Sequence, residues 1–91
     1  MKFVWDEAKR RNNLHSHGLD FADAVLIFDG YTYTYEDDRI AYGEQRFVTL
    51  GLLKGVPVPL VHTETHDEIR VISLRKATQR EERILFGSFP D

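Results

Sequence analysis

The chain contains no cysteine and no long apolar run, and these absences exclude several classes of protein. Without cysteine it can form neither disulfides nor thiolate metal sites, so the reducing cytoplasm is the expected location. No apolar run approaches the roughly 20 residues that a membrane-spanning helix needs. No signal-peptide pattern opens the chain. We therefore expect a cytoplasmic protein that does not use a membrane.

Sequence motifs for metals and cofactors are missing as well. The chain has no P-loop, dinucleotide fingerprint or nucleophile elbow. His15 and His17 are two apart, on different faces of a helix, and His62 and His66 are isolated. This pattern does not predict a metal centre. We expect no metal and no cofactor.

What the sequence does contain indicates a small globular domain with two charged poles. Its 91 residues, 42% of them hydrophobic and 30% charged, suit one domain over residues 1–91. The net charge of −3 argues against a protein that binds nucleic acid over most of its surface. Residues 20–38 include acidic but no basic side chains, whereas residues 9–11 and 70–83 are rich in Arg and Lys. One pole suits a polyanion and the other a basic partner.

Two helices are predicted before the strands begin. Asp6 suits the N-cap of a helix that runs to about His15, with Gly18 as its stop. Asp20 caps a second helix, whose apolar residues recur at i, i+3, i+4 and i+7 and should face the core. These residues are Phe21, Ala24, Val25 and Phe28, and we expect them to pack against Val48, Leu50, Val71 or Leu74.

The remaining sequence favours strands, which places the protein in the α+β class. Lys2–Trp5 begins a short strand, and four further strands with short connections predict an antiparallel meander. These four are Tyr31–Tyr35, Arg46–Lys54, Val56–Thr65 and a strand from Glu68 to about Leu74, with a polar loop at Glu36–Gly43. A break or bulge is expected near Gly51, and Pro57 with Pro59 indicates an edge strand or an irregular entry into a strand. The helices should pack on a four- to five-stranded, mainly antiparallel sheet.

The last strand leads into a helix and carries fixed cations. Its apolar residues alternate onto both faces, Ile69 and Val71 on one and Ile72 and Leu74 on the other, which suits a central strand. Thr78 and Glu81 form a capping box that starts the helix. Arg70 and Arg75 accompany the strand, five residues apart. They point to opposite faces unless the strand ends or bulges between them.

Bases and cations without a cofactor can cleave RNA. A base takes the proton of the 2′-OH, the oxygen attacks the adjacent phosphate, and an acid protonates the leaving group. Arginines stabilise the charge that develops on the phosphate. His17 or Glu44 could transfer protons, and the candidate phosphate ligands are Lys9, Arg46, Arg70 and Arg75. Glu44 and Arg46 could instead be an ordinary strand pair, and His17 could simply cap a helix end.

Three segments resemble the BrnT-type toxins. The first is similar to the family signature W-D-x-x-K-x-x-x-N-x-x-K-H-G-x-x-F-x-x-A-x-x-V-F, and its matching residues are Trp5, Asp6, Lys9, Asn13, His17, Gly18, Phe21, Ala24 and Phe28. Glu44-x-Arg46 with Gly51 downstream resembles the family's E-x-R…G segment. The stretch from Arg70 to Glu81 resembles its R-I-I-S-A-R-x-A-T-x-x-E close.

The resemblance implies a RelE-like fold and an endoribonuclease toxin of a type II toxin–antitoxin pair. It also implies a BrnA-type antitoxin with a ribbon-helix-helix DNA-binding part, so that operator DNA is reached only through the antitoxin. The catalytic residues expected on RNA are Lys9, His17, Glu44, Arg46, Arg70 and Arg75, and the expected RNA-binding residues are Arg10, Lys76 and Arg80. The alternative is a non-catalytic binding module or co-repressor subunit. The tyrosines of Asp29–Asp38 could anchor a basic antitoxin segment or belong to the core.

Overall fold

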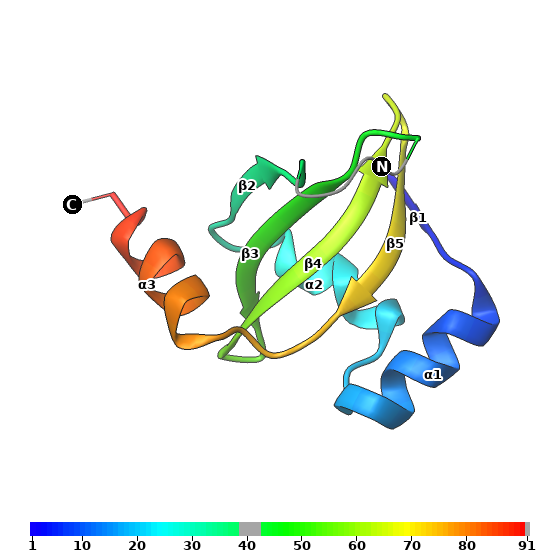
Figure 1. Ribbon diagram of the computed structural model, residues 1–91, viewed down its shortest axis with the longest axis horizontal. Coiled ribbons are helices and arrows are strands. Elements are labelled where there is room, and N and C mark those ends of the chain that lie inside the picture. Colours follow the sequence, from blue (N-terminus) through cyan, green and yellow to red (C-terminus); the bar gives the residue numbers. More distant parts are fainter. Residues whose placement is uncertain (39–42, 91) are drawn as a thin grey trace.

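The computed structural model describes residues 1–38 and 43–90, which form one mixed sheet with helices on its faces and edge (Figure 1). The strand order is β1-β5-β4-β3-β2, with β1 parallel to β5 and the other pairs antiparallel. The elements are β1 (Lys2–Val4), α1 (Glu7–His17), the 3₁₀ helix η1 (Phe21–Asp23), α2 (Ala24–Ile27), β2 (Tyr33–Glu36), β3 (Phe47–Leu53), β4 (Val56–Glu64), β5 (Glu68–Leu74) and α3 (Gln79–Gly87). The predicted α+β class is confirmed. None of the helices within the described ranges is long and apolar enough to cross a membrane.

The helix ends follow the predicted chemistry. The Asp6 side chain accepts from the backbone N–H of Lys9, and Gly18 ends α1 in the left-handed conformation at φ 69°. The capping box of Thr78 and Glu81 is present at the start of α3. Part of the predicted loop Glu36–Gly43, residues 39–42, lies outside the described residues.

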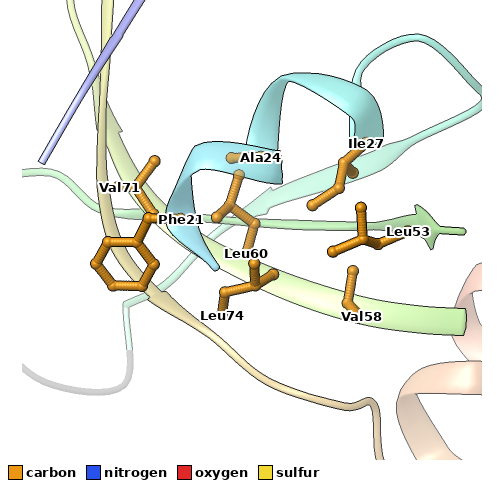
Figure 2. Packing of buried hydrophobic residues seen from close by; sticks show 8 residues of the cluster. All are labelled: Phe21, Ala24, Ile27, Leu53, Val58, Leu60, Val71 and Leu74. Carbon is orange, nitrogen blue, oxygen red and sulfur yellow. The ribbon is translucent and has the colours of Figure 1, made fainter. Parts of the chain in front are cut away.

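The sheet has two faces with separate apolar clusters. On the face that η1 and α2 cover, here called the α2 face, the buried residues are Phe21, Ala24, Ile27, Leu53, Val58, Leu60, Val71 and Leu74 (Figure 2). Figure 2 shows Phe21 beside Val71 and Ile27 above Leu53. On the opposite face, here called the α3 face, Val48 and Leu50 pack with Leu85 of α3. Since the second cluster is the smaller one, α3 leaves part of its face uncovered.

The second helix buries Phe21 and Ala24 as predicted, but it buries Ile27 in place of Val25, and Phe28 is only partly buried. It begins as a 3₁₀ turn and its buried residues recur every third position, at Phe21, Ala24 and Ile27. A 3₁₀ helix has three residues per turn, so this spacing replaces the i, i+4 spacing of an α-helix. The prediction for Val25 is therefore wrong, since that residue is 45% exposed. The prediction that Val71 and Leu74 pack with this helix is confirmed, whereas Val48 and Leu50 lie on the opposite face of the sheet.

Gly51 sits within an unbroken strand, contrary to the predicted interruption. It pairs in register with Val58 across β3 and β4. A Cβ atom at Gly51 would lie 2.6 Å from Cγ2 of Ile27. Glycine is thus present because α2 approaches the sheet closely at this point, and the backbone itself needs no special conformation.

Gly51→Ala should lower the free energy of unfolding by about 1–3 kcal/mol, since overpacking a dense core costs this much. Urea denaturation measures the effect. Gly30→Ala is the matched control, because a Cβ there meets no atom within 4 Å and the backbone is not left-handed. Equal stability of the two variants would contradict the close approach of α2.

Pro57 and Pro59 lie in the third strand of five, so of the two predicted alternatives the edge strand is wrong. The strand is nevertheless open locally, since β5 pairs with β4 only from Leu60 onwards. The carbonyl of Pro57 accepts from the N–H of Ala77, which follows β5. In a strand the N and C=O of one residue point to the same side, so both prolines direct their missing donors to the side without a strand.

A bulge in β5 changes which residues share a face. Val71 pairs with His62 and Ser73 with Val61, so Ile72 is an extra residue between two adjacent partners. After a bulge the alternation of side chains shifts by one residue. Leu74 consequently joins Val71 on the α2 face, and the prediction that these two residues lie on opposite faces is wrong. The same shift brings Arg75 to the face that carries Arg70.

Candidate active site on the α3 face

A carboxylate and two arginines meet where β5 and the segment before β3 come together. Nη2 of Arg70 donates to both carboxylate oxygens of Glu44, at 2.7 and 2.8 Å. Nη2 of Arg46 lies 3.5 Å from Glu44 Oε1. The side chains of Glu44 and Arg70 are 40% and 48% exposed, so a substrate can reach them. We call Glu44, Arg46 and Arg70 the Glu44 cluster.

The sheet register places this cluster on the α3 face. Arg70 is opposite Thr63 in β4, and its Nε donates to Thr63 Oγ1 at 3.4 Å. Thr63 is two residues beyond Val61, which packs on the α3 face. Arg46 is joined to the end of β2, because its carbonyl accepts from the N–H of Asp37 at 2.8 Å. The strand pairs therefore hold the cluster together even though its members are far apart in sequence.

Arg75 forms a second anchored cation on the same face. Its Nη1 and Nη2 lie 2.8 and 2.9 Å from the two oxygens of Glu81, a two-pronged arrangement that fixes the guanidinium plane. Glu81 also accepts from the N–H of Thr78 at 2.8 Å. Partial burial alone would raise the pKa of Glu81, but the hydrogen bonds from Arg75 and Thr78 outweigh it and the pKa lies below its usual range. The capping box thus also orients an arginine.

A groove of about 610 Å³ opens beside Arg75, between β2 and α3. Its lining residues are Tyr33, Tyr35, Arg75, Thr78, Arg80, Glu81 and Ile84. We call it the tyrosine groove. A smaller hollow of about 150 Å³ adjoins it and includes Glu36, Asp37 and Asp38. Arg80 thus lines the same groove as Arg75, and Lys76, next to Arg75 in the chain, is exposed.

The predicted site residues of α1 lie on one stripe of that helix. Lys9, Asn13 and His17 are spaced by four residues and so share a face. The buried Asn13 side chain donates to the carbonyl of Leu74 at 2.7 Å and accepts from its N–H at 3.2 Å. The stripe is thus fastened to the residue before Arg75. In the described part of the chain no hydrogen bond or ion pair joins Lys9 or His17 to Glu44 or Arg70.

Arg10 is engaged within the protein. Its Nε donates to Glu7 at 2.8 Å and its Nη1 to Asp20 at 3.1 Å. These hydrogen bonds raise the pKa of its guanidinium. RNA phosphate would have to compete with two carboxylates for this side chain.

His62 is a buried titratable group that the sequence did not single out. It lies on the α2 face, stacked on Phe47 with Phe28 edge-on, and its Nε2 is 2.8 Å from Thr49 Oγ1. Burial lowers the pKa of this imidazole, although Glu64, whose Oε1 is 3.6 Å from Nδ1, partly opposes the shift. Because Phe47 and Phe28 both pack against the imidazole, His62 is a core residue and lies away from the Glu44 cluster.

Stability should therefore fall as the pH drops below the ordinary histidine pKa of about 6.5. In that range the unfolded chain binds a proton at residue 62 that the folded chain does not, so acid favours unfolding. Urea denaturation between neutral and mildly acidic pH measures the slope. His62→Gln should flatten it, whereas His66→Gln, at a fully solvated side chain that is 93% exposed, should not. An unchanged slope in His62→Gln would refute this role.

The fold and the site together define a small α+β protein that carries arginines and an accessible carboxylate on one face of its sheet. The comparisons make the class specific. The family model described as ribonuclease toxin, BrnT, of type II toxin-antitoxin system matches residues 5–81. The crystal structure of the Brucella abortus ribonuclease toxin BrnT is similar at a TM-score of 0.66 and 32% identity, covering 87% of this chain and 99% of that one. No curated protein matches the chain in sequence.

The chain belongs to the BrnT family of ribonuclease toxins of type II toxin–antitoxin systems. The resemblance noted in the three sequence segments is confirmed, and with it the ribonuclease class. Because type II toxins are paired with an antitoxin, the protein has an antitoxin partner.

Proposed function

We propose that the protein is a metal-independent endoribonuclease in which Glu44 is the general base and Arg46, Arg70 and Arg75 bind the phosphates of RNA. The observation that carries the proposal is the Glu44 cluster, an accessible carboxylate held by Arg70 2.7 Å away on the open part of the α3 face. A carboxylate in this setting can accept a proton while its arginine neighbours face an incoming anion.

The reaction follows from these groups. Glu44 removes the proton of the 2′-OH, and the freed oxygen attacks the adjacent phosphorus. The bond from phosphorus to the 5′-oxygen breaks, and that oxygen leaves with a proton from an acid. The products are a 2′,3′-cyclic phosphate and a 5′-hydroxyl. The arginines stabilise the added charge on the non-bridging oxygens, where their donors are worth more than in water.

The acid is assigned to the α1 stripe. His17 carries an imidazole, a frequent proton donor in catalysis, and it lies one turn beyond Asn13, which fastens α1 to Leu74. Lys9 lies one turn before Asn13 and supplies a further cation. Arg80 and Lys76 extend the basic surface from Arg75 along the RNA. Arg10 takes part only if phosphate displaces one of its two carboxylates.

The partner is proposed to be a BrnA-type antitoxin whose ribbon-helix-helix part binds operator DNA, so that the toxin meets DNA only indirectly. Residues 1–91 act as a single toxin domain. An enzyme that cleaves cellular RNA works in the cytoplasm, where the antitoxin restrains it. The competing function, a non-catalytic binding module or co-repressor subunit, predicts no RNA cleavage at all.

Purified protein should cleave single-stranded RNA equally well with and without EDTA, because the proposed chemistry uses only side chains. The described residues contain no group of three side chains that could hold a metal ion. Gel analysis of a labelled RNA measures cleavage and identifies the cyclic phosphate. A 2′-O-methyl analogue is the control and should stay intact, since its 2′-oxygen cannot attack. Activity that EDTA abolishes and Mg²⁺ restores would overturn the mechanism, and no cleavage under any condition would favour the binding module.

A further inference from the structure

The tyrosine groove contains two aromatic side chains that the core does not use. Tyr33 and Tyr35 alternate along β2, the last strand of the sheet order, and are 40% and 37% exposed. Their ring centroids are 6.2 Å apart with planes inclined by 47°. The expectation that tyrosines of this segment could be ordinary core is therefore wrong for these two. They form an open aromatic surface at the edge of the sheet.

Two arginines and one carboxylate lie beside these rings. Arg75, Arg80 and Glu81 line the groove with them, together with Thr78 and Ile84. Glu81 pairs with Arg75, so Arg80 is the arginine of the lining that Glu81 does not engage. A groove of this volume, about 610 Å³, is within the range of small-molecule sites. Aromatic faces beside arginines are the combination that single-stranded nucleic acids use, because bases stack on the rings and phosphates meet the cations. The groove therefore has the chemistry of a nucleotide site.

We infer that the tyrosine groove is a nucleobase-binding subsite for single-stranded RNA, in which Tyr33 and Tyr35 stack on a base and Arg75 holds its phosphate. The inference rests on the proposed function, since it assigns the substrate of the same α3 face. Stacking is tolerant of sequence, so the subsite selects unpaired RNA more than a particular base.

Such a subsite would help to align the RNA for in-line attack by the 2′-oxygen. Attack by the 2′-oxygen needs the attacking oxygen, phosphorus and leaving oxygen in line, and holding reactants in this geometry lowers the barrier. Drawing one base out of the stack onto a fixed aromatic surface turns the sugar next to it. Arg75 links the subsite to the Glu44 cluster, because the β5 bulge places Arg75 and Arg70 on one face.

The acidic residues beside the tyrosine groove restrict where an RNA strand can lie. Glu36, Asp37 and Asp38 line the small hollow next to Tyr35. These carboxylates repel phosphate, whereas Arg80, which lines the groove but not the hollow, attracts it, and Arg75 lies between them and lines both. A basic antitoxin segment would prefer the acidic hollow, so RNA and antitoxin binding can be told apart by substitution.

Binding of a fluorescent single-stranded 2′-O-methyl RNA, which cannot be cleaved, tests the inference through fluorescence anisotropy. Tyr33→Ala and Tyr35→Ala should each weaken binding roughly tenfold to a hundredfold. Tyr33→Trp and Tyr35→Phe keep an aromatic face and should bind as the wild type does. Tyr31→Ala is the matched control, since Tyr31 is equally exposed at 42% but donates to the Ser88 carbonyl and packs on Phe89 away from the groove.

The results separate this inference from the proposed function. Weaker RNA binding in Tyr33→Ala and Tyr35→Ala, with circular dichroism unchanged, supports the subsite even if Glu44 proves dispensable for cleavage. Wild-type affinity for RNA in both variants overturns it. Unchanged RNA affinity with lost antitoxin affinity also overturns it and makes the tyrosines a protein-docking surface.

Discussion

Glu44→Gln should lower the kcat of RNA cleavage by about 10²–10⁴-fold, the usual contribution of a positioned general base. Glutamine keeps the size of the side chain and can still accept from Arg70, which now donates to both Glu44 oxygens. It cannot take a proton from the 2′-OH. The loss should therefore fall on kcat with little change in RNA affinity. Single-turnover cleavage of a labelled RNA separates the two quantities.

A second glutamate provides the matched control for the change of charge in Glu44→Gln. Glu82→Gln makes the same chemical change in the first turn of α3, away from the Glu44 cluster, and should leave activity intact. Wild-type kcat in Glu44→Gln would exclude this residue as the base.

Arg75→Ala should reduce cleavage by about 10²–10³-fold and abolish growth arrest on induced expression. Removing one preorganised donor to a transition state typically costs this factor. Arg75 is held in one orientation by both oxygens of Glu81, so its loss removes a cation whose position on the α3 face is already fixed. Thr78 still caps α3 without it, because the capping hydrogen bonds do not involve Arg75. The variant should therefore fold and bind its antitoxin normally.

Arg83→Ala is the control for the change in net charge, since Arg83 is an exposed residue of the same helix that is not part of the groove lining. Its toxicity should equal that of the wild type. Protein level, thermal melting and antitoxin binding are compared in all three proteins. Full toxicity of Arg75→Ala at matched protein level would remove Arg75 from the site.

Local rules predicted the parts of the fold that depend on neighbouring residues. Asp6 and Gly18 mark the ends of α1, and Thr78 with Glu81 starts α3, because capping hydrogen bonds span only a few residues. The strands were found from β-branched and aromatic content, although Tyr31 precedes β2 instead of belonging to it. The parallel pairing of β1 with β5 has no local signal.

Predictions failed where packing decides between local alternatives. Periodicity cannot distinguish the 3₁₀ spacing that buries Ile27 from the α-helical spacing that would bury Val25. Nothing near Gly51 in sequence indicates that Ile27 lies above it. The prolines of β4 are tolerated only because β5 ends before it reaches Pro59. Each of these outcomes depends on residues distant in the chain.

The candidate site was predicted as a set of residues but not as an arrangement. The charged residue types identified Glu44, Arg46, Arg70 and Arg75, and all four lie on the α3 face. That Glu44 pairs with Arg70 and Arg75 with Glu81 could not be read from spacing, because the first contact joins residues 26 apart in sequence. The tyrosine groove was not predicted, because nothing in the sequence shows that Tyr33 and Tyr35 lie beside Arg75 and Arg80.

The extra residue at Ile72 ties the geometry of catalysis to the stability of the protein. A β5 strand that folded without the bulge would turn Arg75 away from Arg70 and would expel Leu74, now fully buried, into water. The large cost of exposing a core leucine makes that alternative register rare. Chains in which Arg75 and Arg70 lie on different faces would therefore be unstable and open to proteolysis.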